Sequence, residues 1–316
     1  DQTARGDEKW MQALKSLGIV KNLNFKIGHA AIVLVEMASG KLRYFDFGRY
    51  YTPRGYGRAR SLAFEPNLAL QTRASFNAAG TEITNLSEIL AELTQIETYT
   101  HGAGRLLCSI SHGISFSTAV DFAEKLEGTG PIPYGALANN HNSCSRYVAQ
   151  ILTAALPPGD KRINKIRYPE SFKASPTSNV VNGATAQQVY CYHNDTLDCW
   201  SMNRMKSFKF QFAQLKENFS AKTAKMLPAD DAPSLLVAPN RPQHIPDTAQ
   251  WLGGIGEGGW FNLLDLGNKQ YRIDRYNPMG LQQQKTITHC IQQFDIHRPY
   301  SFLYHFINPV SINVLC

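Results

Sequence analysis

The stretch that most constrains the fold of this chain is residues 134–156, in which a loop passes into a helix. Apolar side chains recur at three- and four-residue steps from Val148 to Ala155, and this spacing predicts one buried helix face. The Asn-rich first half is typical of a loop, and the Pro-Pro-Gly run at residues 157–159 ends the helix. Cys144 therefore lies where the loop becomes the helix.

Cys144 is a candidate nucleophile because of this position. Asn142 or Ser143 precedes it as the expected N-cap, so free N–H groups and the positive end of the helix dipole favour an anion there. A thiol in such a place can have its pKa lowered from about 8.5 to roughly 3.5–7.5. The alternative is a small buried apolar residue at the start of a core helix.

His29 is the candidate base for that thiol. Residues 25–36 form a nearly unbroken apolar run that predicts a strand buried on both faces, and residues 42–48 return as its antiparallel partner. Gly28 leaves open space beside the histidine. A histidine in a buried strand is alternatively a core residue bonded to backbone, but cysteine with histidine is the smallest pair that performs acyl transfer.

Asp46 is the candidate for a third group that orients the imidazole. A turn centred on residues 39–40 pairs Asp46 with Val33, on the same strand face as His29 but further along. A loop over residues 36–39 places Asp46 directly opposite His29, and a bulge at the turn sends it to the other face. The alternative for Asp46 is a solvated carboxylate at a loop edge.

These residues resemble the circularly permuted papain-like superfamily, in which a histidine on an early strand precedes a cysteine that opens a later helix. The superfamily includes permuted NlpC-type cell-wall peptidases and lecithin-retinol acyltransferase-like enzymes. The matching stretches are Gly28-His29-Ala-Ala-Ile-Val-Leu, Tyr44-Phe-Asp46-Phe-Gly and Asn142-Ser-Cys144-Ser-Arg-Tyr-Val. Ser143 separates Asn142 from Cys144, whereas those families commonly place Asn and Cys side by side. The chain also resembles a bacterial family of this type that carries an extra C-terminal domain.

The resemblance implies a papain-like catalytic site. Cys144 would be the nucleophile, His29 the base and Asp46 the orienting group, with the backbone N–H of Cys144 and one neighbouring donor as the oxyanion hole. Other histidines are alternative bases: His101, His112 and His141.

An Arg- and Tyr-rich stretch over residues 49–60 predicts a loop that forms a substrate rim. Aromatic and guanidinium groups in such a loop suit a polymeric, anionic substrate. The expected substrate-binding residues are Arg49, Tyr56, Arg58, Tyr134 and Asn142.

The formal net charge of +7 favours anionic partners. The basic residues are scattered and form no block long enough for a nucleic-acid arm, so no nucleic acid is expected. No apolar run approaches the length of a membrane span. The sequence begins with Asp1 and not Met, which fits removal of a signal peptide or tag, and a secreted or periplasmic location is favoured over a cytoplasmic one.

No metal or other cofactor is expected. Residues 254–259 match the glycine motif of dinucleotide-binding proteins, which requires a helix after it. A strand is expected after these residues, which favours a glycine-rich turn. Cys191, His193 and Cys199 could supply zinc ligands, but no Cys-x-x-Cys pair supports this. Alternatively, a hairpin turn around residues 194–196 would set Cys191 opposite Cys199, close enough for a disulfide, and reduced thiols are equally allowed.

Together these patterns predict an α+β protein. Residues 1–165 are expected to form a permuted papain-like catalytic domain of antiparallel sheet and helices, and residues 166–316 a linker and a smaller, mainly β accessory domain. Prolines among glycine and serine are typical of a linker over residues 157–185. The expected function is cysteine-dependent acyl hydrolysis by a peptidase or amidase that acts on bacterial cell-wall peptide. A lipid thioesterase or acyltransferase is one alternative. A non-catalytic binding protein on a papain-like scaffold is the other.

Overall fold

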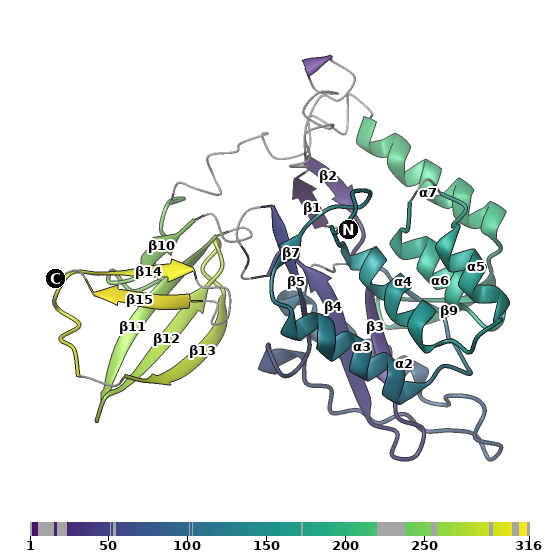
Figure 1. The fold of residues 1–316 in the computed structure, drawn as a ribbon, viewed down its shortest axis with the longest axis horizontal. Helices are drawn as coiled ribbons and strands as arrows, with labels where there is room; N and C mark the ends of the chain where they lie inside the picture. Colours follow the sequence, from purple (N-terminus) through teal and green to yellow (C-terminus); the bar gives the residue numbers. More distant parts are fainter. Residues whose placement is uncertain are drawn as a thin grey trace. The chain divides into compact units, whose positions relative to one another are not determined.

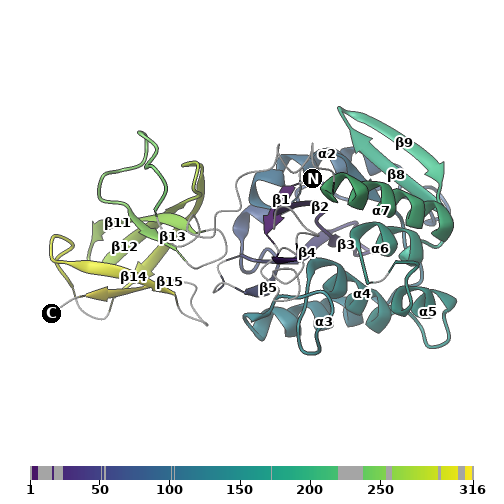
Figure 2. The ribbon, with the colours of Figure 1, turned by 90° about the horizontal axis from the view of Figure 1, so that it is seen from above.

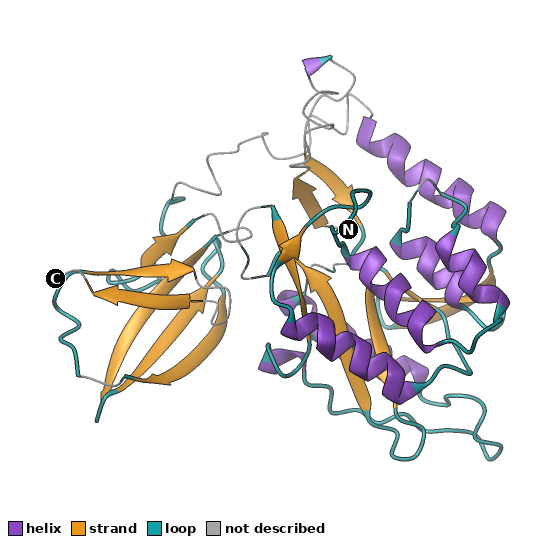
Figure 3. Ribbon diagram, viewed as in Figure 1, coloured by secondary structure: helices purple, strands orange, loops and turns teal. Residues whose placement is uncertain are grey.

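The computed structural model describes residues 2–5, 16–17, 24–50, 52, 55–100, 102, 104–171, 173–219, 238–253, 258–290, 293–304 and 310–314. The chain divides into two compact units (Figure 1). Unit 1 comprises residues 1–48, 59–129 and 135–230, and unit 2 comprises residues 49–58, 130–134 and 231–316. Within the described ranges, the α-helices belong to unit 1 and strands occur in both units (Figure 3), which confirms the predicted α+β class.

The strand predicted over residues 25–36 is divided in two. Its first part, β2 (Asn24–Ile27), pairs with β1 (Gln2–Arg5), and its second part, β3 (Ala31–Val35), pairs antiparallel with β4 (Leu42–Gly48). The chain thus changes partner over residues 28–30. The four-stranded sheet runs in the order β3-β4-β5-β7, with β5 at Tyr56–Arg60 and β7 at Ile132–Pro133.

Strand β4 is buried along almost its whole length, and most of its side chains are apolar or aromatic. Phe45 and Phe47 are fully buried, and the Phe47 ring lies 6.0 Å from that of Tyr147 on the helix that packs against the sheet. Strand β4 therefore forms the centre of the unit 1 core.

The described helices of unit 1 include α2 (Leu86–Gln95), α3 (Phe116–Gly128) and α4 (Cys144–Ala155). Helix α4 packs against α3, β3 and β4, and α3 and α4 lie side by side (Figure 2). The apolar face predicted for α4 is buried from Val148 to Ala155, as its spacing requires. No helix in the described part of the chain is long and apolar enough to cross a membrane.

The Pro-rich segment that was expected to be a linker contains two capped helices. Helix α5 (Lys161–Arg167) begins after the N-cap Asp160, and α6 (Pro176–Gly183) begins after a capping box at Ser175. Proline fits the first turn of α6 because backbone N–H groups in the first turn of a helix have no intrahelical acceptor, so the missing N–H of proline breaks no helical hydrogen bond. Both helices pack against α4, and they belong to unit 1 together with it.

A second sheet of unit 1 contains β6 (Leu106–Cys108), β8 (Gln188–His193) and β9 (Thr196–Ser201). Asn194 and Asp195 both have positive φ and form the two-residue turn of the β8–β9 hairpin. This turn pairs Cys191 with Asp198, which puts Cys191 and Cys199 on opposite faces of the hairpin. The predicted placement of Cys191 opposite Cys199 is therefore wrong, and both thiols are free.

Unit 2 is mainly β, as predicted. One antiparallel sheet has the order β10 (Gln250–Leu252), β11 (Gly259–Gly267), β12 (Gln270–Tyr276) and β13 (Gln282–His289). A second pair consists of β14 (Tyr300–Tyr304) and β15 (Val310–Val314). Strand β11 follows the glycine-rich stretch and pairs with β10, and residues 254–257 lie outside the described residues. A buried hydrophobic cluster of unit 2 consists of Phe261, Leu263, Tyr271 and Phe302.

Candidate active site

Cys144 is the first residue of α4, and polar side chains hold the loop before it. Ser143 is the N-cap, and its Oγ accepts a hydrogen bond from the N–H of Arg146 at 3.3 Å. The buried Asn142 side chain accepts a hydrogen bond from the N–H of Ser143 at 2.9 Å and donates one to Gln150 at 3.0 Å. The thiol thus lies at a helix N-terminus whose entry is fixed by capping.

His29 lies in the break between β2 and β3, and not inside a strand as predicted. Gly28 approaches Pro176 of α6 closely, since a Cβ added at Gly28 would lie 3.5 Å from the proline ring. Ala30, the next residue after the histidine, belongs to the same core cluster as Cys144. The break in the strand therefore brings the histidine to the N-terminus of α4.

The imidazole of His29 contacts the carboxylate of Asp46. Nε2 of His29 lies 3.0 Å from Oδ2 of Asp46. In the observed register Asp46 pairs with Ala31. The sequence allowed two registers that put Asp46 on the same face as His29, one opposite Val33 and one opposite His29, and the observed register lies midway between them. Asp46 and His29 are thereby diagonal neighbours on one face of the strand pair, within reach of each other's side chains. The contact also leaves Nδ1 as the ring nitrogen available to the thiol.

Asp46 is fully buried and is held by a guanidinium. Arg60, which is 2% exposed, donates from Nε to Oδ1 at 2.9 Å and from Nη2 to Oδ2 at 3.1 Å. The hydroxyl of Tyr44 donates to Oδ2 at 3.1 Å, and Arg60 also donates to the carbonyl oxygen of Tyr99 at 2.5 Å. A bidentate ion pair of this kind keeps a buried carboxylate ionised and fixes its orientation.

The electrostatics favour a charged thiolate and imidazolium. Burial raises the pKa of Asp46, but the charge of Arg60 and the hydrogen bond to His29 outweigh it, so that the pKa lies well below its usual range. Burial lowers the pKa of His29, but hydrogen bonds to Asp46 and Cys144 raise it to about 9. Burial raises the pKa of Cys144, but the hydrogen bond and charge of His29 lower it to about 7.

Two polar groups on the α4 side of the site were not predicted. Ser145 Oγ lies 3.8 Å from Sγ of Cys144, and this hydroxyl is one of the groups that lower the pKa of the thiol. Asn179 of α6 donates to the carbonyl oxygen of Ser145 at 2.8 Å, which joins α6 to the first turn of α4. The folded segment after residue 165 therefore supports the site.

Tyr44 and Arg60 were also missed as parts of the site. Tyr44 precedes Asp46 by two residues on β4, and this period of two was a usable signal. Arg60 was placed in the loop over residues 49–60, but Tyr56–Arg60 form strand β5, and that strand buries the arginine. An arginine that pairs across strands leaves no local signal in the sequence.

The other expected binding residues fall in different parts of the chain. Arg49 lies over the ring of Tyr134, with its guanidinium carbon 4.8 Å from the ring centroid. Tyr56 is half-buried in β5, and Arg58 on the same strand is buried. These four residues belong to unit 2, whereas Asn142 belongs to unit 1. Their role in substrate binding stays a prediction.

The remaining histidines and cysteines form no metal site in the described part of the chain. His101 lies outside the described residues. His141 Nδ1 lies 3.0 Å from the carbonyl oxygen of Asn139, and His112 is exposed. Among the described residues, no three His, Cys, Asp or Glu side chains gather as a metal site would require.

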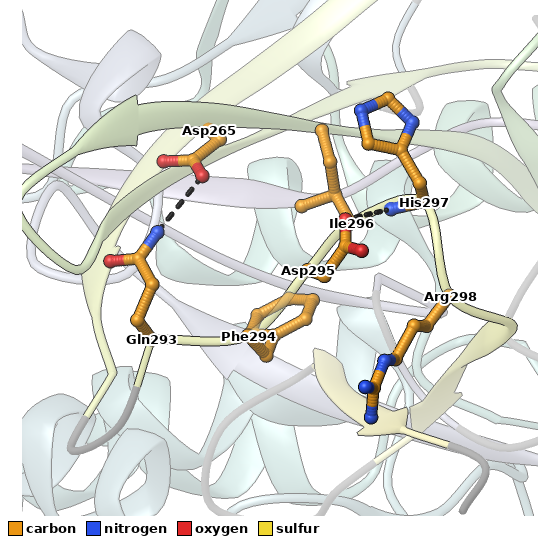
Figure 4. Close-up of a pocket in the computed structure, with 7 residues that line it drawn as sticks. All are labelled: Asp265, Gln293, Phe294, Asp295, Ile296, His297 and Arg298. Atoms are coloured by element: carbon orange, nitrogen blue, oxygen red, sulfur yellow. Dashed lines mark hydrogen bonds between the residues drawn. The ribbon is translucent and has the colours of Figure 1, made fainter.

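Unit 2 contains a pocket of about 590 Å³, shown in Figure 4. Its polar groups bind one another: Gln293 donates to Asp265 at 3.0 Å, and the N–H of His297 donates to Asp295 at 2.9 Å. The lining holds no cysteine, serine or threonine: it consists of Asp265, Gln293, Phe294, Asp295, Ile296, His297 and Arg298. This pocket therefore offers no thiol or hydroxyl nucleophile.

The structure thus gathers a thiol, an imidazole and a carboxylate at a helix N-terminus, and these are the groups that a cysteine hydrolase needs. The chain belongs to the type VI secretion system effector TseH-like family, whose model matches residues 1–159. That range includes His29, Asp46 and Cys144. Residues 249–309 match the model of the DUF6695 C-terminal domain. Searches of curated proteins and of solved structures found no match.

Cys144 is expected to react with iodoacetamide fastest among the described thiols at about pH 7. Its pKa is lowered to about 7, whereas burial raises the pKa of Cys108 to about 12. Its labelling rate should fall as the pH drops below about 7, because only the thiolate reacts. Peptide mapping at a series of pH values measures this, with the exposed Cys199 as internal reference. Faster labelling of Cys199 at pH 7 would contradict the prediction.

Proposed function

We propose that this protein is a cysteine-dependent hydrolase effector that cleaves an amide bond in bacterial cell-wall peptide. The observation that carries the proposal is the contact of His29 with both Asp46 and Cys144 at the N-terminus of α4. A cysteine with a lowered pKa beside an oriented imidazole is the arrangement that nucleophilic acyl transfer needs.

In the proposed reaction, the thiolate of Cys144 attacks the carbonyl carbon of the substrate amide. The developing oxyanion is stabilised by the N–H of Cys144, for which no acceptor lies within hydrogen-bond distance among the described residues. The imidazolium of His29 then protonates the leaving amine, which breaks the C–N bond and leaves a thioester on Cys144. Neutral His29 next takes a proton from water, and the hydroxide releases the acid and restores the thiol pair.

Asp46 serves this cycle by holding the imidazole in one orientation. Because Nε2 of His29 faces the ionised carboxylate, Nδ1 faces the thiol in both protonation states of the ring. Asp46 itself does not change its charge, since Arg60 keeps its pKa well below the working range. It acts through His29 and is a positioning residue.

The choice of cell-wall peptide rests on two supports. Membership of a secretion-effector family favours a target outside the producing cell, which agrees with a secreted or periplasmic location. The formal net charge of +7 favours attraction to an anionic polymer. A lipid thioesterase uses the same thiol chemistry and remains the alternative enzyme. A non-catalytic scaffold would need no thiol with a lowered pKa, so the pKa of about 7 for Cys144 favours an enzyme.

Substrate class is tested by incubating the full chain separately with purified peptidoglycan and with a long-chain acyl thioester. We expect new amine termini from peptidoglycan at a rate that is at least about tenfold above that of Cys144→Ala. If the unaltered chain and Cys144→Ala give equal rates on both substrates, the proposal that this protein is a cysteine-dependent enzyme is wrong. Thioester hydrolysis through Cys144 without release from peptidoglycan would replace the substrate but keep the mechanism.

A further inference from the structure

The sulfur of Cys144 lies where little water reaches it. Cys144 is 7% exposed, and Ser145, the next residue of α4, is 4% exposed. A charged sulfur that is removed from water is stable only where hydrogen-bond donors replace the water. The ring of His29 and the N–H of Ala30 supply two such bonds from the break between β2 and β3. A third donor would stabilise the thiolate from the helix.

The hydroxyl of Ser145 has one hydrogen-bond partner among the described residues, and that partner is the sulfur. Its Oγ lies 3.8 Å from Sγ of Cys144. A buried hydroxyl that donates to nothing costs free energy, so its proton is expected to point at the sulfur. Once His29 has taken the thiol proton, the sulfur can only accept. Ser145 is then the donor of this pair.

Asn179 of α6 fixes the backbone of the same serine. Asn179 is 6% exposed, and its Nδ2 donates to the carbonyl oxygen of Ser145 at 2.8 Å. The first turn of a helix is otherwise weakly held, because its N–H groups lack intrahelical acceptors. A bond from a neighbouring helix to this turn therefore limits the movement of Ser145 and of its hydroxyl.

Helix α6 is itself held near both of its ends by polar side chains. At its start, the N-cap Ser175 donates to Gln211 of helix α7 (Arg204–Phe219) at 2.7 Å. In its last turn, the buried Asn182 donates to Glu170 at 2.8 Å. These bonds join α6 to two other segments of unit 1. The donor to the first turn of α4 thus comes from a helix with a fixed position.

We propose that the Ser145 hydroxyl donates a hydrogen bond to the Cys144 thiolate, and that Asn179 positions Ser145 for this task from α6. Ser145 contacts the reacting sulfur, whereas Asn179 acts through Ser145 and is a positioning residue. Asn179 lies beyond residue 159, where the match to the effector family ends. The inference rests on the proposed function in one respect, since it takes Cys144 as the nucleophile.

Ser145→Ala is expected to move the midpoint of the pH profile of Cys144 alkylation upward by about 0.5–1 pH unit. Burial raises the pKa of this thiol, and His29 and, to a smaller degree, Ser145 lower it to about 7. Ser145→Thr keeps a hydroxyl and should restore most of the shift. Iodoacetamide labelling of the full chain with peptide mapping measures each profile, at a temperature at which every variant is folded.

Asn179→Ala should move the midpoint in the same direction, but it should add nothing in the Ser145→Ala background, because it acts through that hydroxyl. A merely structural role would shift the midpoint in both backgrounds. Thr153→Val is the control: it removes a hydroxyl from the same helix, one that donates to the carbonyl oxygen of Ala149 at 2.7 Å. Its profile should match that of the unaltered chain.

An unchanged midpoint in Ser145→Ala would overturn the proposal. So would equal shifts in Ser145→Ala and Ser145→Thr, or a further shift when Asn179→Ala is added to Ser145→Ala. Alkylation needs no substrate, so these profiles decide the inference separately from the proposed hydrolysis. If the shifts appear while the unaltered chain releases nothing from cell-wall peptide, the support of the thiolate by Ser145 stands and the proposed substrate is wrong.

Discussion

Cys144→Ala and His29→Ala are each expected to lower the rate of cell-wall peptide hydrolysis by roughly 10³- to 10⁶-fold, and the double variant by no more than the larger single loss. Attack needs both groups, since His29 lowers the pKa of Cys144 to about 7 and then carries the proton for the leaving amine. Because the two side chains act together, removal of either one abolishes the catalysis that depends on both. The rate of release of amine termini from peptidoglycan, measured for all four proteins, tests this.

Cys199→Ala is the matched control, because Cys199 is an exposed free thiol on β9. It should retain the full rate, and all of the variants should unfold at similar temperatures. If the losses of the two single variants multiply in the double variant, Cys144 and His29 do not act as one unit. If Cys144→Ala retains the activity, the nucleophile is another group.

Arg60→Met is expected to lower the free energy of unfolding by about 3–5 kcal/mol. The substitution keeps an unbranched side chain of similar length but leaves the carboxylate of Asp46 buried without its guanidinium. The pKa of Asp46 should then rise, so that it holds the imidazole less firmly and hydrolysis slows under conditions in which the variant is folded. Denaturant unfolding near neutral pH measures the first effect.

Arg43→Met is the control for this prediction. Arg43 pairs with Glu124 across the surface, where both side chains are partly exposed. Loss of such a pair changes stability by about 0–1 kcal/mol. Equal losses for Arg60→Met and Arg43→Met would show that the buried pair with Asp46 contributes no more than a surface pair does.

The sequence was sufficient to predict the start of α4 and the residues that meet there. Local signals carry that information: a loop composition, a helical spacing and an N-cap all point to Cys144 as a helix start. The pairing of β3 with β4, the strand that carries Asp46, also follows from the apolar pattern. The register of this strand pair could not be predicted from the sequence. It depends on the length of the turn between β3 and β4, and several turn lengths fit the sequence.

Features that depend on distant parts of the chain were not predictable in the same way. Arg60 stands in a basic, aromatic stretch typical of a loop, and only its pairing with Asp46 across the sheet makes it a buried residue. The segment after residue 157 was expected to be a linker from its prolines. Instead, Pro176 occupies the first turn of α6, and contacts with α4 make that segment part of unit 1.

The positions of Cys191 and Cys199 show the same limit on a smaller scale. A shift of one residue in a hairpin exchanges the two faces, and the Asn194–Asp195 turn fixes the register one residue away from the disulfide pairing. The type of turn determined this outcome, and the cysteine spacing did not.

The central claim is that Cys144 carries the acyl group during hydrolysis. Intact-protein mass spectrometry of a rapidly acid-quenched reaction with peptidoglycan peptides, followed by peptide mapping, measures this most directly. The predicted result is an added mass equal to the acyl fragment, located on Cys144, released by hydroxylamine and absent in Cys144→Ala. An adduct on another residue, or peptide release that is undiminished in Cys144→Ala, would contradict the account.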